Sequence, residues 1–263
     1  MKIKANKAFG QHWLRDKTAL FDVLTAAEIT KNDTVLEVGP GLGTLTEILS
    51  ESAKEVIAVE ADTKLVGPLR VQFFQKPNVT FVEADILKFD LTTLPSQYKV
   101  AANIPYYLTS NLIRTLLEAS NPPQVMALLI QKEVAERITA KPGQMSVLAF
   151  SVQYYAAAQI IRVVGKELFD PPPKVESAII QIIRRPQPAF EADNEKLFKL
   201  VKAGFGEKRK MLRNSLAGGL QLETNQVEGL LKESGLSATA RAQELSLDDW
   251  HRLYSSSLAL QVL

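Results

Sequence analysis

The chain has 263 residues, of which 46% are hydrophobic and 23% are charged, and its formal net charge is +2. Such a chain is long enough for one large core, or for a large domain with a small one. It contains no cysteine, which excludes disulfides, thiolate metal sites and cysteine nucleophiles. Its two histidines, His12 and His251, are too few for a multi-histidine site, so we expect no metal. No apolar run is long enough to cross a bilayer, and we expect a cytoplasmic protein with no membrane partner.

Short apolar runs alternate with helical patterns through most of the chain. The predicted strands are 34–38, 55–59, 79–82, 100–103, 125–130, 159–164 and 178–183. The helices predicted between them are 44–52, 111–118, 131–139 and 146–155. This alternation favours an α/β fold in which helices cover both faces of a parallel sheet. The last two strands lack a long helix between them, so we expect an antiparallel end that makes the sheet mixed.

A proline-interrupted stretch at 184–188 reads as a linker, after which the strand signals stop. The predicted helices beyond it are 195–205, 208–217, 224–234 and 247–256. Asp193 or Asn194 is expected to cap the first of these helices, and Ser246 the last. We therefore predict two domains, a ligand-binding catalytic domain over 1–185 and a small all-helical domain over 186–263.

The segment 37–43, Glu-Val-Gly-Pro-Gly-Leu-Gly, follows a predicted strand and precedes a helix. Glycines such as Gly39 and Gly41 allow a tight turn and a close approach of the backbone to a ligand. The spacing differs from the G-x-G-x-x-G of dinucleotide sites. Glu60 ends the second strand, where a carboxylate can accept both ribose hydroxyl hydrogens, and Asp85 follows the third, where one can accept from an adenine amine. These three strand ends predict an S-adenosylmethionine site.

The segment Asn103-Ile104-Pro105-Tyr106 stands at the end of the fourth strand. Pro105 drives Ile104 into an extended conformation, so the Ile104 carbonyl and the Asn103 side-chain oxygen can face the same space. Two acceptors suit the two hydrogens of an exocyclic amine, and Tyr106 can stack on its base. Phe169, before a proline-rich turn, can close the other face of a flipped-out base. The pattern therefore predicts methyl transfer to a base nitrogen, by positioning and electrostatics.

Each of these features has a plainer structural interpretation. The glycines can form an ordinary turn beside solvated acids, which is the usual alternative for a lone glycine motif. Asn103 can cap a turn beside a buried Tyr106, and Phe169 can be a core residue. We favour the ligand site because the polar groups fall at consecutive strand ends.

Five motifs in chain order resemble one family, the rRNA adenine dimethyltransferases that act on the small ribosomal subunit. They are Phe-Gly-Gln-His-Trp-Leu (9–14), Glu-Val-Gly-Pro-Gly-Leu-Gly-Thr-Leu-Thr (37–46), Asn-Ile-Pro-Tyr (103–106), Gln-Lys-Glu-Val-Ala-Glu-Arg (131–137) and Phe-Asp-Pro-Pro-Pro-Lys-Val-Glu-Ser (169–177). The resemblance runs nearly from end to end. It implies a Rossmann-like S-adenosylmethionine-dependent methyltransferase sheet with a small helical C-terminal domain.

The resemblance also implies the reaction and its residues. The reaction is dimethylation of the N6 amines of two adjacent adenosines in the 3′-terminal hairpin loop of small-subunit (16S) rRNA, within a 30S-type particle. Tyr106 and Phe169 would sandwich the target adenine. The implied cofactor contacts are Gln11, His12, Leu14, Gly39, Gly41, Glu60, Asp85 and Asn103. The family's commonest residue at position 12 is asparagine, and imidazole replaces only one amide hydrogen bond, so the role of the His12 side chain stays open.

Basic residues gather in the first half of the predicted helical domain. They are Lys202, Lys208, Arg209, Lys210 and Arg213. A cationic helix face can hold RNA phosphates, although a solvated face is the plain alternative. The segment 208–214 resembles the RNA-facing region of the family, so we predict that Lys208, Arg209, Lys210 and Arg213 bind RNA. We expect a monomer.

Three other functions fit part of the pattern. The large-subunit (23S) rRNA adenine methyltransferases that confer macrolide resistance share the cofactor and Asn-Ile-Pro-Tyr motifs. The segments 208–214 and 241–246 instead resemble the small-subunit enzymes. A non-catalytic ribosome-assembly factor would not need the intact acceptor motif at Asn103. A nicotinamide enzyme is disfavoured by the glycine spacing.

Overall fold

The computed structural model describes residues 11–207 and 210–263 and divides the chain into two compact units. The first unit takes the chain up to Glu136 together with residues 157–184. The second unit comprises residues 137–156 and 185–263. The boundary at residue 184 falls beside the predicted linker. The predicted division assigned residues 137–156 to the catalytic domain. In the structure they belong to the second, helical unit.

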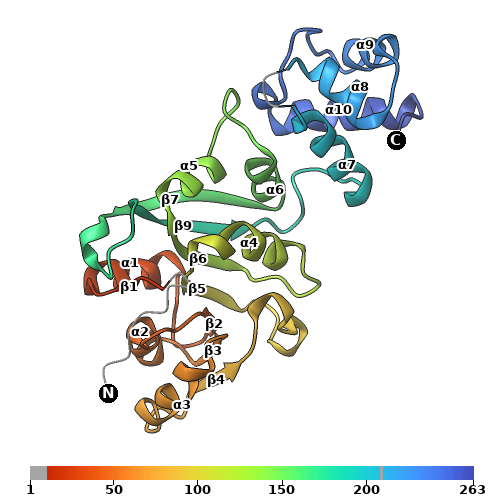
Figure 1. The fold of residues 1–263 in the computed structure, drawn as a ribbon. Helices are drawn as coiled ribbons and strands as arrows, with labels where there is room; N and C mark the ends of the chain where they lie inside the picture. Colours follow the sequence, from red (N-terminus) through yellow and green to blue (C-terminus); the bar gives the residue numbers. More distant parts are fainter. Residues whose placement is uncertain (1–10, 208–209) are drawn as a thin grey trace. The chain divides into compact units, whose positions relative to one another are not determined.

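A seven-stranded sheet in the order β4-β3-β2-β5-β6-β9-β7 forms the centre of the first unit (Figure 1). Its strands are β2 (Thr34–Val38), β3 (Glu55–Glu60), β4 (Val79–Glu83), β5 (Lys99–Asn103), β6 (Val125–Gln131), β7 (Ala156–Val164) and β9 (Ser177–Arg184). The pairs from β4 to β6 are parallel, whereas β9 pairs antiparallel with β6. The expectation of a mixed sheet is therefore confirmed.

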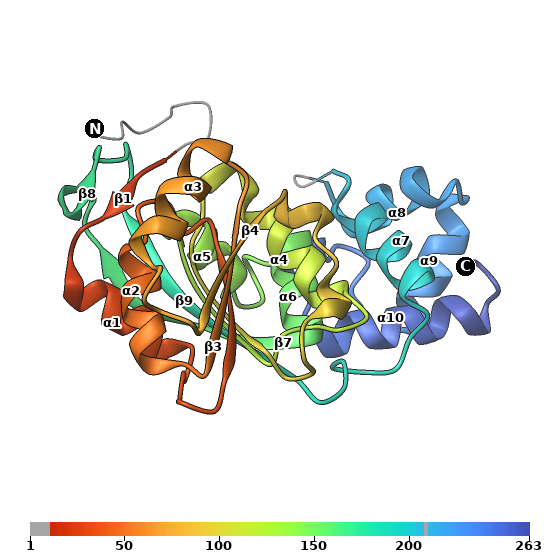
Figure 2. The ribbon, with the colours of Figure 1, turned by 90° about the horizontal axis from the view of Figure 1, so that it is seen from below.

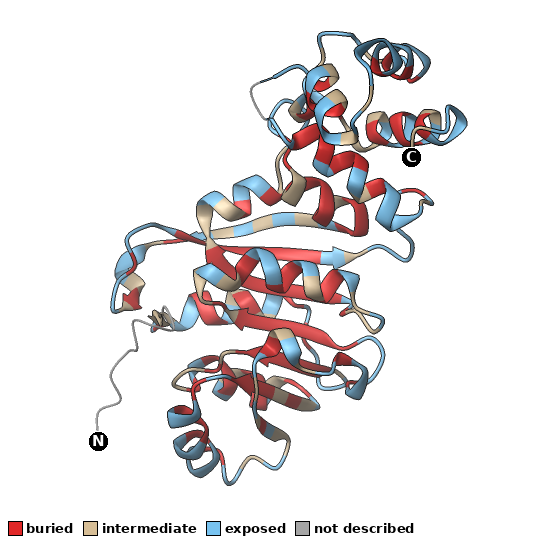
Figure 3. Cartoon of the chain, turned by 45° about the vertical axis from the view of Figure 1, so that its right-hand side comes forward, coloured by how far each residue is buried: buried red, intermediate tan, exposed pale blue. Residues whose placement is uncertain are grey.

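Helices lie on both sides of this sheet. In the first unit they are α1 (Lys17–Ala26), α2 (Thr44–Ser52), α3 (Thr63–Gln72), α4 (Thr109–Glu118) and the start of α5 (Lys132–Ile138), with short 3₁₀ turns η2 (Ile86–Lys88), η3 (Leu91–Thr93), η4 (Tyr106–Leu108) and η5 (Lys166–Leu168). Figure 2 shows α1 and α2 on one side of the strands and α4 on the other. The interior strands are buried over nearly their whole length, as expected for a sheet covered on both faces (Figure 3).

A second, very small sheet joins distant parts of the first unit. Strand β1 (Trp13–Leu14) pairs antiparallel with β8 (Phe169–Asp170), with Leu14 opposite Phe169. Leu14 and Phe169 are both buried, in a core cluster that also contains residues of α1, α2 and the large sheet. This pairing holds the N-terminal segment against the unit that carries the other site motifs.

The second unit is helical and has an aromatic core. Its helices are α6 (Val147–Tyr155), α7 (Asn194–Phe205), α8 (Leu212–Leu220), α9 (Thr224–Glu233) and α10 (Leu247–Ala259), with the 3₁₀ turn η6 (Ala242–Glu244). Phe150 of α6 packs edge-on against Trp250 of α10, with ring centroids 5.9 Å apart. Tyr154 packs against Phe190 at 5.1 Å. The predicted α/β class with a helical C-terminal part is confirmed.

The predicted N-caps of α7 and α10 are present in the structure. Asp193 accepts a hydrogen bond from the Lys196 amide at the start of α7, and Ser246 accepts one from the Asp249 amide at the start of α10. The prediction that a helix spans 208–217 is wrong at its start, because Met211 is extended and α8 begins at Leu212. Lys208 and Arg209 lie outside the described residues.

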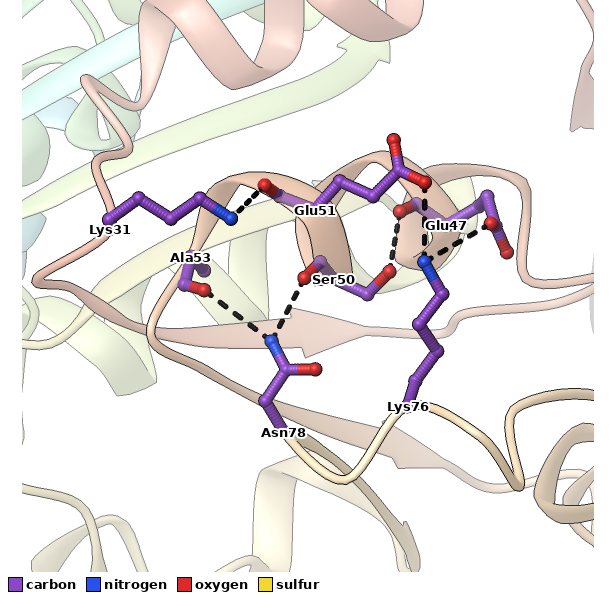
Figure 4. Close-up of polar contacts among 7 residues, drawn as sticks. All are labelled: Lys31, Glu47, Ser50, Glu51, Ala53, Lys76 and Asn78. Atoms are coloured by element: carbon purple, nitrogen blue, oxygen red, sulfur yellow. Dashed lines mark hydrogen bonds and ion pairs between the residues drawn. The ribbon is translucent and has the colours of Figure 1, made fainter.

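Helix α2 is anchored at its C-terminus by side chains from two other segments (Figure 4). The Asn78 side-chain amide donates to the carbonyls of Ser50 (2.9 Å) and Ala53 (3.4 Å), and the Lys31 ammonium donates to that of Glu51. The last carbonyls of a helix have no partner within it, so these donors replace water or a glycine cap. They fix α2 on the sheet and thereby position the glycine loop at its other end.

We predict that Asn78→Ala lowers the free energy of unfolding by about 1 kcal/mol, because two hydrogen bonds to helix-end carbonyls are lost. Urea denaturation followed by circular dichroism measures the change. Lys76→Ala is the matched control from the same loop, since it removes only ion pairs to Glu47 and Glu51, whose side chains are about half or more exposed. An equal loss in both variants would contradict the anchoring role of Asn78.

Candidate functional site

A cavity of about 320 Å³ lies in the first unit where the parallel strands end. Its walls come from the N-terminal segment, the loops after β2, β3 and β4, and the Asn103–Leu108 segment after β5. The predicted cofactor residues all line it: Gln11, His12, Leu14, Gly39, Gly41, Glu60, Asp85 and Asn103, and Tyr106 joins them. The motifs that the sequence placed at consecutive strand ends thus share one cavity.

The glycine loop needs its glycines for backbone conformation and for space. Gly39 and Gly41 have φ angles of +67° and +59°, in the left-handed region that side chains disfavour. Gly43 has φ +80°, and a Cβ atom there would lie 2.6 Å from the ring of Phe73, which directly follows α3. The loop therefore stays tight between strand and helix and exposes backbone to the cavity at its first two glycines.

Two carboxylates mark the ends of β3 and β4. Glu60, which is 6% exposed, accepts hydrogen bonds from the Gly41 amide (3.2 Å) and the Asp62 amide (2.9 Å). Burial raises its pKa, against the lowering effect of these amides. Asp85 is exposed and uses Oδ1 to accept from the Leu87 amide at 3.0 Å, which leaves Oδ2 facing no partner in the described part of the chain.

Glu37 is a third acid in the cavity wall, and its side chain was not among the predicted site residues. It is 1% exposed, and the Thr46 hydroxyl donates to Oε2 at 2.6 Å. Burial, with a smaller contribution from the nearby Glu60 charge, raises its pKa to about 8 against the lowering effect of the Thr46 hydrogen bond. The carboxyl is therefore mainly protonated at neutral pH. The sequence signal that could have identified Glu37 as a site residue is its position in the glycine segment 37–43.

The Asn103 side chain has a defined orientation. Its Nδ2 donates to the backbone carbonyl of His12 at 3.0 Å, so its oxygen remains as an acceptor beside the cavity. The Ile104 amide donates to the Leu129 carbonyl at 3.3 Å, which continues the strand pairing past Asn103. Pro105 then precedes η4. The orientation of the Asn103 side-chain amide is thus fixed by a contact with a residue 91 positions earlier in the sequence.

Tyr106 is held from two sides. Its hydroxyl lies 2.7 Å from the Ser177 hydroxyl, and its ring stacks with the His12 ring at a centroid distance of 5.9 Å. Burial raises the pKa of Tyr106, so its phenol stays neutral. The His12 Nδ1 lies 2.8 Å from the Pro171 carbonyl, which only accepts, so Nδ1 carries the hydrogen. The imidazole thus braces the tyrosine.

Phe169 has a different environment from the other predicted site residues. It is 5% exposed, packs in the core cluster with Leu14, and is not among the residues that line the cavity. Tyr107, in contrast, lines the cavity and is 66% exposed, although it was not among the predicted site residues. Its place directly after the Asn-Ile-Pro-Tyr motif was the only sequence signal.

The predicted RNA-binding residues belong to the second unit. Lys210 forms an ion pair with Glu207, and Arg213 forms one with Glu228 at 2.6 Å. Lys202 lies exposed on α7. Lys210 and Arg213 thus already have acidic partners, a fact that charge counting along the sequence does not reveal.

Comparison with known proteins identifies the family. The family described as "Ribosomal RNA adenine dimethylase" matches residues 2–258. The chain belongs to the ribosomal RNA adenine dimethylase family. The family is one of enzymes, and its reaction requires a methyl donor and ribosomal RNA. This confirms the resemblance seen in the sequence motifs.

Curated relatives of this dimethylase carry the name ribosomal RNA small subunit methyltransferase A. One from Dehalococcoides mccartyi is 42% identical over 255 residues, covering 95% of this chain and 88% of the relative. One from Streptococcus gordonii is 40% identical and covers 94% and 90% of the two chains. Their shared name concerns the small ribosomal subunit.

Solved structures show the same fold over nearly the whole dimethylase chain. A dimethyladenosine transferase from Plasmodium falciparum has a TM-score of 0.84 at 25% identity and covers 95% of this chain and 98% of its own. The 23S rRNA methyltransferase ErmE has a TM-score of 0.75 at 29% identity and covers 93% and 98%. This chain therefore shares its fold with a dimethyladenosine transferase and with a 23S rRNA methyltransferase.

In residues 11–207 and 210–263, no helix of the dimethylase combines the length and apolar character of a membrane span. Nor do these residues bring three or more histidine or acidic side chains together in a group able to hold a metal ion.

We predict that Glu37→Gln makes stability less dependent on pH. The folded-state pKa of about 8 exceeds the ordinary 4.5, so the native wild-type protein keeps a proton that the unfolded chain loses. Wild-type stability should fall from pH 5 to pH 8 by about 1 kcal/mol per unit relative to the variant. Urea unfolding at pH 5 and pH 8 measures this slope. Glu47→Gln, in the exposed face of α2, is the control, and parallel curves for wild type and Glu37→Gln would refute the shifted pKa.

Proposed function

We propose that this enzyme transfers methyl groups from S-adenosylmethionine to the N6 amines of two adjacent adenosines in the 3′-terminal hairpin loop of small-subunit rRNA. The observation that carries the proposal is the orientation of Asn103. Its amide nitrogen is engaged by the His12 carbonyl at 3.0 Å, so the side-chain oxygen is the atom left to accept a hydrogen bond from a substrate amine.

The cavity fits S-adenosylmethionine by its size and its donor and acceptor groups. Glu60 keeps lone pairs beyond its two amide bonds and would accept from the ribose hydroxyls. Asp85 Oδ2 would accept from the adenine amine. Gly39 and Gly41 leave the backbone close to the ligand, and the Gln11, His12 and Leu14 segment closes the opposite wall. When bound, the cofactor supplies an electrophilic methyl group.

The protein's part in the chemistry is to orient the amine. In the first transfer, Asn103 and the Ile104 carbonyl would accept the two N6 hydrogens, drawing the nitrogen lone pair out of conjugation with the ring and toward the methyl group. In the second transfer, one of these acceptors would hold the single hydrogen that remains on N6. The amine loses its proton after transfer, so no strong base is needed. Tyr106, held by Ser177 and His12, would stack on the adenine. Phe169 would cover its other face, a role that requires this side chain to leave its present packing in the core.

The second half of the proposal concerns the substrate. The curated relatives at about 40% identity are named for the small subunit, which supports a small-subunit target. We propose that residues 1–185 bind the cofactor and carry out transfer, and that residues 186–263 bind rRNA in a 30S-type particle through Lys208, Arg209, Lys210 and Arg213. We further propose that the enzyme acts as a monomer in the cytoplasm.

One alternative has a specific observation in its favour. ErmE, a 23S rRNA methyltransferase, has the same fold at 29% identity, and so a large-subunit target competes with the small-subunit one. Methylation of immature small subunits but not of naked large-subunit RNA would decide between them. A non-catalytic assembly role would predict cofactor binding without any methylation of either substrate.

The decisive experiment incubates the enzyme with small subunits from cells that lack this gene, followed by mass analysis of the rRNA. We expect dimethylation of one adjacent adenosine pair. Asn103→Ala should abolish nearly all transfer, because it removes an acceptor needed in the transition state, and should keep part of the cofactor affinity. Asn32→Ala, an exposed site before β2, is the control. Near wild-type turnover in Asn103→Ala would defeat the amine-orienting mechanism.

Replacing both Lys208 and Arg209 with alanine should weaken binding to the particle and flatten its salt dependence. Each lost phosphate contact should reduce the slope of log K against log salt by about 0.7 to 0.9. Titration of labelled enzyme at several salt concentrations gives this slope. The control replaces the exposed Lys17 and Lys54 of the first unit with alanine, which removes the same amount of charge at another place and should leave the slope unchanged. If both double variants keep the wild-type slope, the 208–209 segment is outside the RNA footprint.

A further inference from the structure

Trp13 presents a buried polar atom with no partner in the described chain. Its Nε1 is inaccessible to solvent and makes no hydrogen bond. The ring packs on the glycine loop, since a Cβ atom at Gly41 would lie 3.2 Å from both Cδ1 and Nε1 of the indole. Trp13 also lines the cavity. An indole N–H in this position has been removed from water without compensation, which costs free energy.

Comparison with other unpartnered groups shows why this one points to a ligand. The described ranges contain four buried side-chain atoms without a hydrogen bond, on Trp13, Thr109, Arg213 and Trp250. Of these four residues, only Trp13 lines the cavity. An uncompensated donor in a cavity wall is satisfied when a bound molecule supplies an acceptor.

The charge pattern of the cavity indicates which acceptor. Glu60 and Asp85 stand at the ends of β3 and β4, where they favour hydroxyl, amine or cationic groups. The Gly41 amide is already engaged by Glu60. A carboxylate in the ligand must avoid the acids and seek free N–H donors, and Trp13 offers one beside the glycine loop.

We propose that the Trp13 ring, whose N–H is closed off from solvent in this structure, turns toward the cavity on binding and donates a hydrogen bond to the methionine carboxylate of the bound cofactor, which makes Trp13 a further cofactor-binding residue. This inference rests on the proposed use of S-adenosylmethionine. The bond satisfies the buried donor and places the amino-acid end of the cofactor beside the indole. A hydrogen bond to a charged acceptor is about twice as strong as a neutral one.

Calorimetric binding of two probes to the full-length protein tests the assignment. S-adenosylhomocysteine has the carboxylate, and 5′-methylthioadenosine has the adenosyl part without it. Trp13→Phe keeps an aromatic ring and removes the N–H, so we expect about a tenfold loss of affinity for the first probe and little change for the second. Trp250→Phe removes an equally unpartnered N–H in the second unit and should leave both affinities unchanged. Equal affinity of wild type and Trp13→Phe for S-adenosylhomocysteine, or equal losses for both probes, would overturn the assignment.

A spectroscopic measurement covers the case in which Trp13→Phe fails to fold. In ¹⁵N-labelled Trp250→Phe protein the remaining indole signal belongs to Trp13, because the chain has two tryptophans. We expect its proton to move downfield on addition of S-adenosylhomocysteine and not on addition of methylthioadenosine. An unmoved signal at saturating probe would also refute the hydrogen bond. Failure of the wild-type protein to bind either probe would instead refute the proposed cofactor.

Discussion

The site depends on one constraint of the sheet, the position of β2 between β3 and β5. The chain runs outward from β2 to β3 and β4 and then returns to the other side of β2 to form β5. The loops that follow β2 and β5 therefore diverge, and a crevice opens at the carboxyl ends of the strands. Glu60, Asp85 and Asn103 each stand at or just after such a strand end, which is why residues far apart in sequence share one cavity.

This constraint also explains what could be predicted from the sequence. Buried parallel strands are continuous apolar runs, so the strand 34–38 was predicted with the bounds that the structure has for β2. The helix predicted over 44–52 likewise has the bounds of α2. Once the strand order is that of an open α/β sheet, any polar residue that ends a strand becomes a candidate for the site. Glu60, Asp85 and Asn103 could be found in this way because their signal is local.

Features that depend on distant contacts had no such signal. The two-residue strands β1 and β8 exist only because Leu14 meets Phe169, more than 150 residues away. The burial of Phe169 and the brace from His12 to Tyr106 follow from that pairing and not from local pattern. Helix α3 was missed because Gly67 and Pro68 interrupt its pattern, and the packing of Leu65 and Leu69 overrides that weak propensity.

The membership of α6 in the second unit has a consequence for how this protein can be divided. The polypeptide passes between the units three times, at 136–137, 156–157 and 184–185. Phe150 and Tyr154 of α6 complete an aromatic core with Phe190 and Trp250 from the C-terminal part of the chain. A fragment cut at residue 185 would carry these rings without their partners, as an apolar surface prone to aggregation. The two units are therefore not separable by a single cut, and a fragment limited to the first unit would need the 137–156 segment replaced by a short polar connection.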